Sequence, residues 1–138
     1  MLIRNCAGGI VFSGDKVLLL KNEKSEWVMP KGVIRHQEDA RAVALGRVEA
    51  EAGVQAEILG NAGDTCYEFY SVTRGTPVCN RIQWFIMAAK EEACRPAEPF
   101  TEAAFFPIQE ALERITYTQD RSLAAITWEK YRNLDKIL

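Results

Sequence analysis

The stretch of residues 32 to 54 carries acidic side chains at spacings that suit metal-assisted chemistry on a phosphate chain. Hydrolysis of a phosphoanhydride requires charge stabilisation on the phosphate oxygens and an oriented water molecule, and Mg²⁺ held by several carboxylates supplies both. At about 100° per residue, positions 47, 50 and 51 share one side of a helix. They hold Arg47, Ala50 and Glu51, so one carboxylate remains with a cation beside it. Glu49 points about 200° away from Glu51 and is a poor replacement for the missing acids.

A helix over residues 39 to 52 must position these side chains. Its apolar stripe consists of Ala44, Leu45, Val48 and Ala52. Gly53 is placed to end the helix, whereas Gly46 lies inside it at a cost of about 1 kcal/mol relative to alanine. Taken alone, such a charged helix is also typical of an ordinary solvated surface.

The same stretch resembles the signature of the Nudix hydrolase family, G-x5-E-x7-R-E-U-x-E-E-x-G-U, in which U is a bulky aliphatic residue. Aligned without gaps, the matching positions are Gly32, Glu38, Val48, Glu51, Gly53 and Val54. Three positions depart from the signature. Gly46 replaces its arginine, and Arg47 and Ala50 each replace a glutamate.

Segments outside the signature extend the resemblance over most of the chain. Residues 6–11, CAGGIV, look like the first strand of the family, and residues 27–32, WVMPKG, resemble the lead-in of its diadenosine and inositol polyphosphate branches. Residues 101–112 resemble its strand that leads into a short helix, and residues 115–121 are similar to a stretch in diadenosine tetraphosphate hydrolases. The resemblance implies an α/β protein with the Nudix fold, a mixed β-sheet sandwiched between α-helices, in one domain spanning residues 1–138.

The resemblance also implies a metal site and its catalytic residues. Glu51 and the backbone carbonyl of Gly32 are the expected ligands of a weakly held Mg²⁺ or Mn²⁺, with substrate phosphates supplying the remaining ligands. Glu51 and Glu38 are the expected catalytic residues, Glu38 as a supporting acid. In the family this acid pairs with the arginine at position 46, so we expect Arg47 to take over as its partner here.

Further side chains are candidates for binding a nucleotide. Lys31 is the preferred phosphate contact because proline and glycine fix its backbone. The arginines that could complete a basic cleft are Arg4, Arg47, Arg74 and Arg81. The aromatic residues of which one is expected to stack on a base are Tyr67, Tyr70 and Trp84. Solvated strand arginines and packed aromatic rings are the plainer interpretations.

Residues far from the helix offer acids and a histidine with less evident roles. Glu102 and Glu110 are candidates for a distal metal ligand or base, or are simple surface acids. His36, the single histidine, is expected to be exposed. The sequence presents no nucleophile with an evident base, so it does not favour covalent catalysis.

The whole-chain composition excludes several classes of protein. A net charge of -2 and a pI near 5.5 predict no general attraction to nucleic acid or anionic lipid. The apolar runs, such as Val17 to Leu20, are too short to span a bilayer, and the N-terminus lacks a signal-peptide layout, so a cytoplasmic location is expected. The scattered cysteines, expected as free thiols, are Cys6, Cys66, Cys79 and Cys94.

The remaining elements follow from hydrophobic periodicity and turn residues. Strands are expected at residues 2–12, 16–21, 54–59, 65–73, 78–89 and 103–106, with an extended piece at 27–32 and a turn at 74–77. Helices are expected at residues 108–114 and 119–136. The glycine pair Gly8-Gly9 predicts a bulge or a close backbone approach. From the last helix, the residues expected to pack are Leu123, Ile126, Tyr131 and Leu134.

The leading functional interpretation is hydrolysis of a nucleoside diphosphate linked to another group, such as a diadenosine polyphosphate. We expect it to be weak because two acids are missing. The expected partner is a small nucleotide or polyphosphate, and the oligomeric state stays open. The alternative is a silent nucleotide-binding module, which Arg47 and Ala50 favour. A purely structural partner protein would require an exposed apolar patch.

Overall fold

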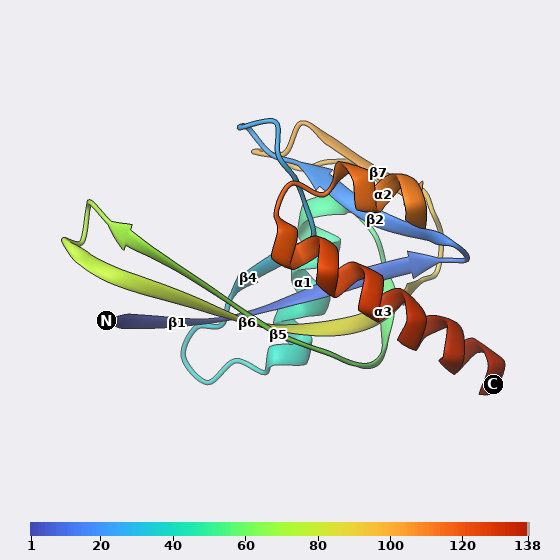
Figure 1. Cartoon of the computed structure of the whole chain (residues 1–138), viewed down its shortest axis with the longest axis horizontal. Helices are drawn as coiled ribbons and strands as arrows, with labels where there is room; N and C mark the ends of the chain where they lie inside the picture. Colours follow the sequence, from blue (N-terminus) through green and yellow to red (C-terminus); the bar gives the residue numbers. More distant parts are fainter. Residues whose placement is uncertain (138) are drawn as a thin grey trace.

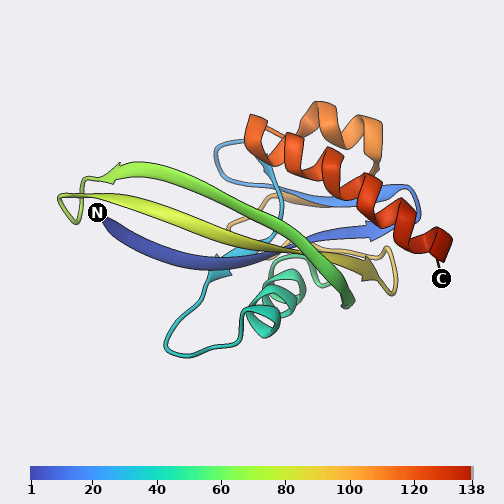
Figure 2. The same ribbon diagram turned by 60° about the horizontal axis from the view of Figure 1, so that its bottom comes forward.

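A computed structural model describes residues 1–137, with side chains described up to residue 134. The strands are β1 (Leu2–Ser13), β2 (Lys16–Lys21), β3 (Trp27–Val28), β4 (Lys31–Val33), β5 (Ala56–Ser71), β6 (Thr76–Ala89) and β7 (Glu102–Pro107). The helices are α1 (Ala40–Ala52), α2 (Ile108–Arg114) and α3 (Thr118–Ile137). Helix α1 covers one side of the sheet, and α2 and α3 cover the other (Figure 2). The expected mixed sheet between helices is confirmed.

The sheet is mixed because its two central strands run parallel while their other partners run antiparallel. Its strand order is β3-β2-β1-β6-β5, with β4 paired to β1 and β7 paired to β2. Strands β1 and β6 form the parallel ladder, from Leu2 opposite Val78 to Phe12 opposite Ala88. A chain whose strands do not alternate regularly with helices reaches this arrangement more readily than a doubly wound parallel sheet.

Alternation along the strands divides the core into two layers. Ile10 and Phe12 of β1 pack toward α2 and α3, and the ring of Phe12 stacks on Tyr131 with centroids 4.5 Å apart. Ala7 and Val11 point to the opposite side and pack with Val48 of α1. Successive side chains of a strand face opposite sides of the sheet, so β1 holds both helical layers in place.

The glycine pair of β1 marks a close approach of neighbouring groups. A Cβ atom on Gly8 would lie 2.6 Å from a ring carbon of Trp84 and 2.7 Å from the carbonyl oxygen of Pro30. A Cβ atom on Gly9 would lie 2.7 Å from the sulfur of Met87. The ladder between β1 and β6 continues across both glycines, so the close approach is confirmed and the bulge is not.

Three local expectations are wrong. Residues 54–59 and 65–73 are not two strands, because the continuous strand β5 keeps its pairing to β6 across irregularities at Ile58/Gly60 and Asn61/Gly63. Thr76 and Pro77 open β6 instead of completing a turn. Ile126 of α3 is 57% exposed, whereas the predicted packing residues Leu123, Tyr131 and Leu134 contact the core.

One end of the sheet extends beyond the helices (Figure 1). We call this end the arm; it comprises residues 66–81 of the β5–β6 hairpin and residues 2–5 of β1. Large apolar side chains stay exposed on it, among them Tyr70 at 62% and Val72 at 88%. None of the helices in the described residues is long and apolar enough to cross a membrane.

Candidate functional site

Helix α1 forms where expected because its ends are fixed by specific residues. The side chain of Asp39 accepts a hydrogen bond from the backbone N–H of Arg41, at 3.4 Å, and caps the first turn. Gly53 adopts the left-handed conformation, at φ 69°, and its N–H donates to the carbonyl of Glu49. Ala44, Val48 and Ala52 are buried against the sheet. Glu51, which immediately precedes Ala52, is thereby drawn inward and is 5% exposed.

Arg47 binds the buried carboxylate of Glu51. Its Nε and Nη2 atoms donate to the same oxygen, Oε2, at 2.9 and 2.6 Å. The expectation that Arg47 pairs with Glu38 is therefore wrong, because one helical turn separates positions 47 and 51 and favours their contact. Burial raises the pKa of Glu51, while the hydrogen bond and charge of Arg47, followed by the charge of Lys31, oppose that rise.

Gly32 lies directly against the side chain of Arg47. A Cβ atom on Gly32 would meet the Cδ and Cγ atoms of Arg47 at 2.6 and 2.7 Å. The two expected metal ligands, Gly32 and Glu51, therefore adjoin the same arginine. Their carbonyl and carboxylate oxygens are of the type that Mg²⁺ prefers. Because the Arg47 side chain is 44% exposed, it has room to turn away, and these residues fit a weakly held cation whose other ligands come from substrate and water.

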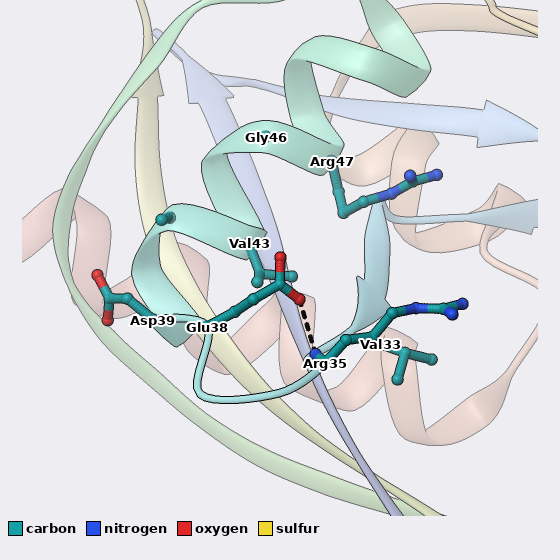
Figure 3. Close-up of a pocket in the computed structure, with 8 residues that line it drawn as sticks. Val33, Arg35, Glu38, Asp39, Val43, Gly46 and Arg47 are labelled. Carbon is teal, nitrogen blue, oxygen red and sulfur yellow. Dashed lines mark hydrogen bonds between the residues drawn. The ribbon is translucent and has the colours of Figure 1, made fainter.

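An open groove of about 500 Å³ separates the loop before α1 from the helix itself, and we call it the helix groove (Figure 3). Its lining includes Arg35, Glu38, Gly46 and Arg47. Glu38 accepts a hydrogen bond from the backbone N–H of Arg35 at 2.7 Å, and Figure 3 shows Arg47 directed away from it. A Cβ atom on Gly46 would meet nothing within 4 Å. Glu38 therefore stabilises the loop before α1. Beside it lies the open space at Gly46, where the family signature has an arginine.

A second, more enclosed hollow lies on the side of the sheet that faces α3. Its volume is about 270 Å³, near the roughly 300 Å³ lower limit of typical ligand pockets. We call it the aromatic hollow; its lining includes Lys31, Thr65, Tyr67, Asn80, Tyr117 and Asp120. Lys31 and Tyr67 were predicted site residues, and the hollow brings them together. The rings of Tyr67 and Tyr117 lie 6.4 Å apart at 57°.

The polar groups of the aromatic hollow were not predicted individually. The Oδ1 atom of Asn80 is buried and has no hydrogen-bond partner among the described residues. Burial raises the pKa of Asp120, and the charge of Lys31 opposes that rise. The hydroxyl of Tyr117 donates to Glu26 at 2.6 Å, and this bond is the main reason that the pKa of Tyr117 rises to about 12. Tyr117 and Asp120 belong to the 115–121 stretch, which was the available signal.

Lys31 connects the two parts of the site. Its charge acts on Glu51 of helix α1 and also on Asp120 of the aromatic hollow. It is half-buried at the start of β4, where it pairs with Gly8 in the ladder to β1. The carboxylate of Glu51 and the aromatic hollow are therefore within electrostatic range of one lysine.

The remaining basic and aromatic candidates are distributed unevenly. Arg4 is half-buried and is paired in register with Asn80, which places it beside the aromatic hollow. Arg81 follows Asn80 and therefore faces the opposite side of the sheet. Trp84 is fully buried, and its Nε1 donates to Thr65 at 2.9 Å, so it packs in the core and is not available for stacking.

The other candidates lie on the surface outside both cavities. Tyr70 is exposed on the arm, and Arg74 is exposed in the turn that joins β5 to β6. Glu102 forms an ion pair with Lys21 at 3.2 Å, and Glu110 pairs with Arg114 at 2.9 Å. These pairs agree with the plainer interpretation of both acids. His36 is exposed, with φ 48°.

Comparisons with known proteins agree with this architecture. The NUDIX domain family matches residues 2–126, so the chain belongs to the Nudix family. The protein called MutT4 from Mycobacterium tuberculosis (strain CDC 1551 / Oshkosh) is 31% identical over 104 residues, which are 75% of this chain and 41% of that protein. The chain thus spans less than half the length of this curated relative.

Solved structures share the fold at low sequence identity. A Nudix hydrolase from Nitrosomonas europaea has a TM-score of 0.74 at 20% identity, covering 96% of this chain and 74% of its own. An Ap4A hydrolase from C. elegans has a TM-score of 0.71 at 15% identity, covering 94% and 98%. An ADP-ribose pyrophosphatase from Streptococcus suis has a TM-score of 0.72 at 15% identity, covering 94% and 92%.

Proposed function

We propose that the chain is a weak, magnesium-dependent hydrolase of a nucleoside diphosphate linked to another group, with diadenosine polyphosphates as the favoured substrates. The observation that carries this proposal is the position of Lys31. It lies within electrostatic range of both the buried acid Glu51 and the aromatic hollow. A nucleoside in the hollow would direct its phosphates past Lys31 toward that acid.

The aromatic hollow suits a nucleobase in both shape and polarity. Tyr67 and Tyr117 provide ring faces, and base–aromatic stacking contributes about 1–3 kcal/mol per base. The buried Oδ1 of Asn80 needs a donor, which an exocyclic amine of a base supplies. Lys31 provides a positive charge for the first phosphate at the edge of the hollow.

In this proposal, Arg47 couples phosphate binding to the release of Glu51 from its ion pair. A guanidinium binds phosphate as well as carboxylate, so an incoming phosphate chain competes with Glu51 for the same donors. With Arg47 turned to the phosphates, the carboxylate of Glu51 and the carbonyl of Gly32 would be free to hold Mg²⁺. Such an ion would supply charge neutralisation on the phosphate oxygens and a water of lowered pKa. With a single protein carboxylate it would be held weakly, so we expect slow hydrolysis.

The test is phosphate release from diadenosine tetraphosphate and ADP-ribose with Mg²⁺ or Mn²⁺. We expect the natural protein to turn over at least one of them, and Glu51→Gln, which preserves shape, to lose that turnover. Equal rates for the two proteins, or undiminished turnover in chelator, would refute the proposal. Circular dichroism of Glu51→Gln confirms that the variant is folded.

The silent nucleotide-binding module is the second candidate, and the Arg47–Glu51 ion pair favours it. An arginine that already neutralises the acid raises the cost of a second cation and leaves anion binding intact. This candidate predicts nucleotide binding in chelator, measured by calorimetry, with no turnover in metal. Arg47→Met should weaken nucleotide binding under either candidate, but only the hydrolase should show metal-dependent turnover in this variant, because Glu51 is then free of its partner.

A further inference from the structure

Two cysteines and a glutamate meet on the arm, on the side of the sheet opposite the aromatic hollow. Thr65, Tyr67 and Asn80 face the hollow. Because side chains alternate along β5 and β6, Cys66, Glu68 and Cys79 face the other way. Glu68 lies directly opposite Cys79 in the ladder, and Cys66 is two pairs further along, opposite Arg81.

These three residues form a compact set of metal ligands. The thiol sulfurs of Cys66 and Cys79 and a carboxylate oxygen of Glu68 all lie within 4.8 Å of one another. Cys66 and Glu68 are exposed, whereas Cys79 is 4% exposed and forms the floor of the cluster. We propose that Cys66, Glu68 and Cys79 bind a thiophilic divalent cation of the zinc type.

The ligand chemistry selects zinc over magnesium. Zn²⁺ accepts thiolate at about 2.3 Å and carboxylate at about 2.0–2.2 Å in tetrahedral geometry, which places neighbouring ligand atoms about 3.5 Å apart. Side-chain rotation that draws the three atoms together by about 1 Å meets this requirement, and water completes the fourth position. Mg²⁺ requires oxygen ligands and rejects thiolates. The cluster is therefore independent of the metal that hydrolysis uses at Glu51.

A direct disulfide is less suited to this register. Cys66 and Cys79 are diagonal neighbours in an antiparallel pair, and the Cα atoms of such neighbours lie about 7–8 Å apart. Disulfides usually span about 4.4–6.8 Å between Cα atoms. A cation bound between the two sulfurs forms two metal–sulfur bonds in place of one S–S bond. It can therefore bridge the larger gap. All four cysteines of the chain are free thiols in the structure.

A cation at this position would link β5 to β6 beyond the helical layers. Figure 1 shows the hairpin projecting there without a covering helix. A ligand that binds the folded state and not the unfolded chain raises stability by mass action. Zinc should therefore raise the Tm of the natural protein, in addition to producing the spectroscopic signal of bound thiolates.

The experiment is a titration of the reduced, chelator-treated protein with Co²⁺, followed by displacement with Zn²⁺. We expect one equivalent of Co²⁺ to produce a thiolate-to-cobalt charge-transfer band that Zn²⁺ abolishes. Cys66→Ser and Cys79→Ser should each weaken binding by more than about tenfold, since loss of even an outer-shell partner of a metal costs about 10- to 100-fold. Cys66 is exposed, so its variant tests the proposal even if Cys79→Ser does not fold.

Matched controls identify the ligands. Cys94→Ser removes a thiol that donates to the carbonyl of Ala103 instead, and it should keep the full band. Glu68→Gln should weaken cobalt binding while preserving the thiolate band at saturation, whereas Glu57→Gln on the same strand should change nothing. Absence of the band, or unchanged cobalt affinity and band intensity in Cys66→Ser, overturns the proposal. Loss of two free thiols in the untreated protein, restored by a reductant but not by a chelator, would instead show a disulfide.

Discussion

The helix groove and the aromatic hollow differ in what they share with the family signature. The groove has the expected helix without the expected acids, whereas the hollow gathers ring and polar groups that the signature does not contain. Around the groove, α1 keeps the expected bounds and caps of the family's signature helix, but Arg47 and Ala50 replace its two glutamates and Gly46 replaces its arginine. In the hollow, no residue belongs to the signature, which Lys31 immediately precedes, yet ring faces and polar groups converge on one space. The candidate nucleotide pocket and the candidate metal ligands, Gly32 and Glu51, are therefore separate sets of residues in this fold.

Restoring the acids of α1 should produce the largest effect. The triple variant Gly46→Arg, Arg47→Glu, Ala50→Glu supplies two more carboxylates and a partner for Glu38. We expect kcat/KM for diadenosine tetraphosphate or ADP-ribose to rise about 100-fold or more, equivalent to roughly 2.7 kcal/mol of transition-state stabilisation. Phosphate release in Mg²⁺ measures it. An unchanged rate would mean that the hollow does not bind these substrates productively.

The second-largest effect should come from removing one ring of the aromatic hollow, which should weaken nucleotide binding. Tyr67→Ala removes a stacking surface, and we expect a loss of about 1–3 kcal/mol, or roughly 5- to 150-fold in Kd. Tyr70→Ala is the matched control, because Tyr70 is on the same strand but 62% exposed and outside the hollow. Calorimetry with ADP in chelator measures both. Equal effects of the two substitutions would place the ligand elsewhere.

Breaking the Arg47–Glu51 pair should lower stability. Arg47→Met leaves a buried carboxylate without its partner, and we expect a loss of about 1–2 kcal/mol, less than the roughly 3–5 kcal/mol of a fully buried pair. The expected loss of stability is smaller because the Arg47 side chain is 44% exposed, and solvent screens a partly exposed ion pair.

The pH dependence of this loss has a defined sign. Burial already raises the pKa of Glu51 above 4.5, and Arg47→Met removes the largest of the interactions that oppose the rise. The folded variant then binds more protons than its unfolded chain, so its stability falls as pH increases above 4.5 until Glu51 is ionised. Urea denaturation from pH 4 to 8 should show a gap between variant and natural protein that widens with pH. A constant gap would show that Glu51 does not carry the effect.

Filling the space at Gly46 should have the smallest effect, and a favourable one. A methyl group there meets no atom within 4 Å and improves helix propensity, so Gly46→Ala should raise stability by about 1 kcal/mol. Gly8→Ala is the contrasting control, because its methyl would lie 2.6 Å from Trp84 and should cost about 1–3 kcal/mol. Denaturant midpoints measure both. A loss of stability in Gly46→Ala would show that the backbone of α1 needs this glycine.

The sequence predicts local elements well where ends are specified by particular residues. Asp39 and Gly53 bound α1 to within a residue of expectation, and Pro107 precedes α2 over its predicted range. It predicts strand continuity poorly, because Gly60 and Gly63 resemble strand breakers but lie at irregularities that preserve pairing to β6. Such pairing depends on the partner strand and leaves no local pattern.

The same distinction applies to the site. Lys31, Gly32 and Glu51 are close in sequence, and the family pattern identified them together. Asn80 and Tyr117 come from segments that meet only after β6 and α3 pack, so nothing near either residue marks it as part of a cavity. The partner of Arg47 was mispredicted because the choice between Glu38 and Glu51 depends on the loop, whose own N–H at Arg35 already occupies Glu38.

The two irregularities of β5 determine which side of the sheet its first residues face relative to the rest of the strand. Each shifts the register to β6 by one residue, from Ile58 opposite Met87 to Gly60 opposite Ile86 and then to Gly63 opposite Trp84. A single shift would exchange the two sides of the strand, whereas a pair of shifts restores them. The turn after Ser71 holds Tyr67 opposite Asn80, so deleting one residue at either irregularity should instead turn the residues before it, such as Ile58, to the other side of the sheet. Deleting one residue at both should return Ile58 to its own side, so we expect β5 to tolerate changes in length there only in even steps.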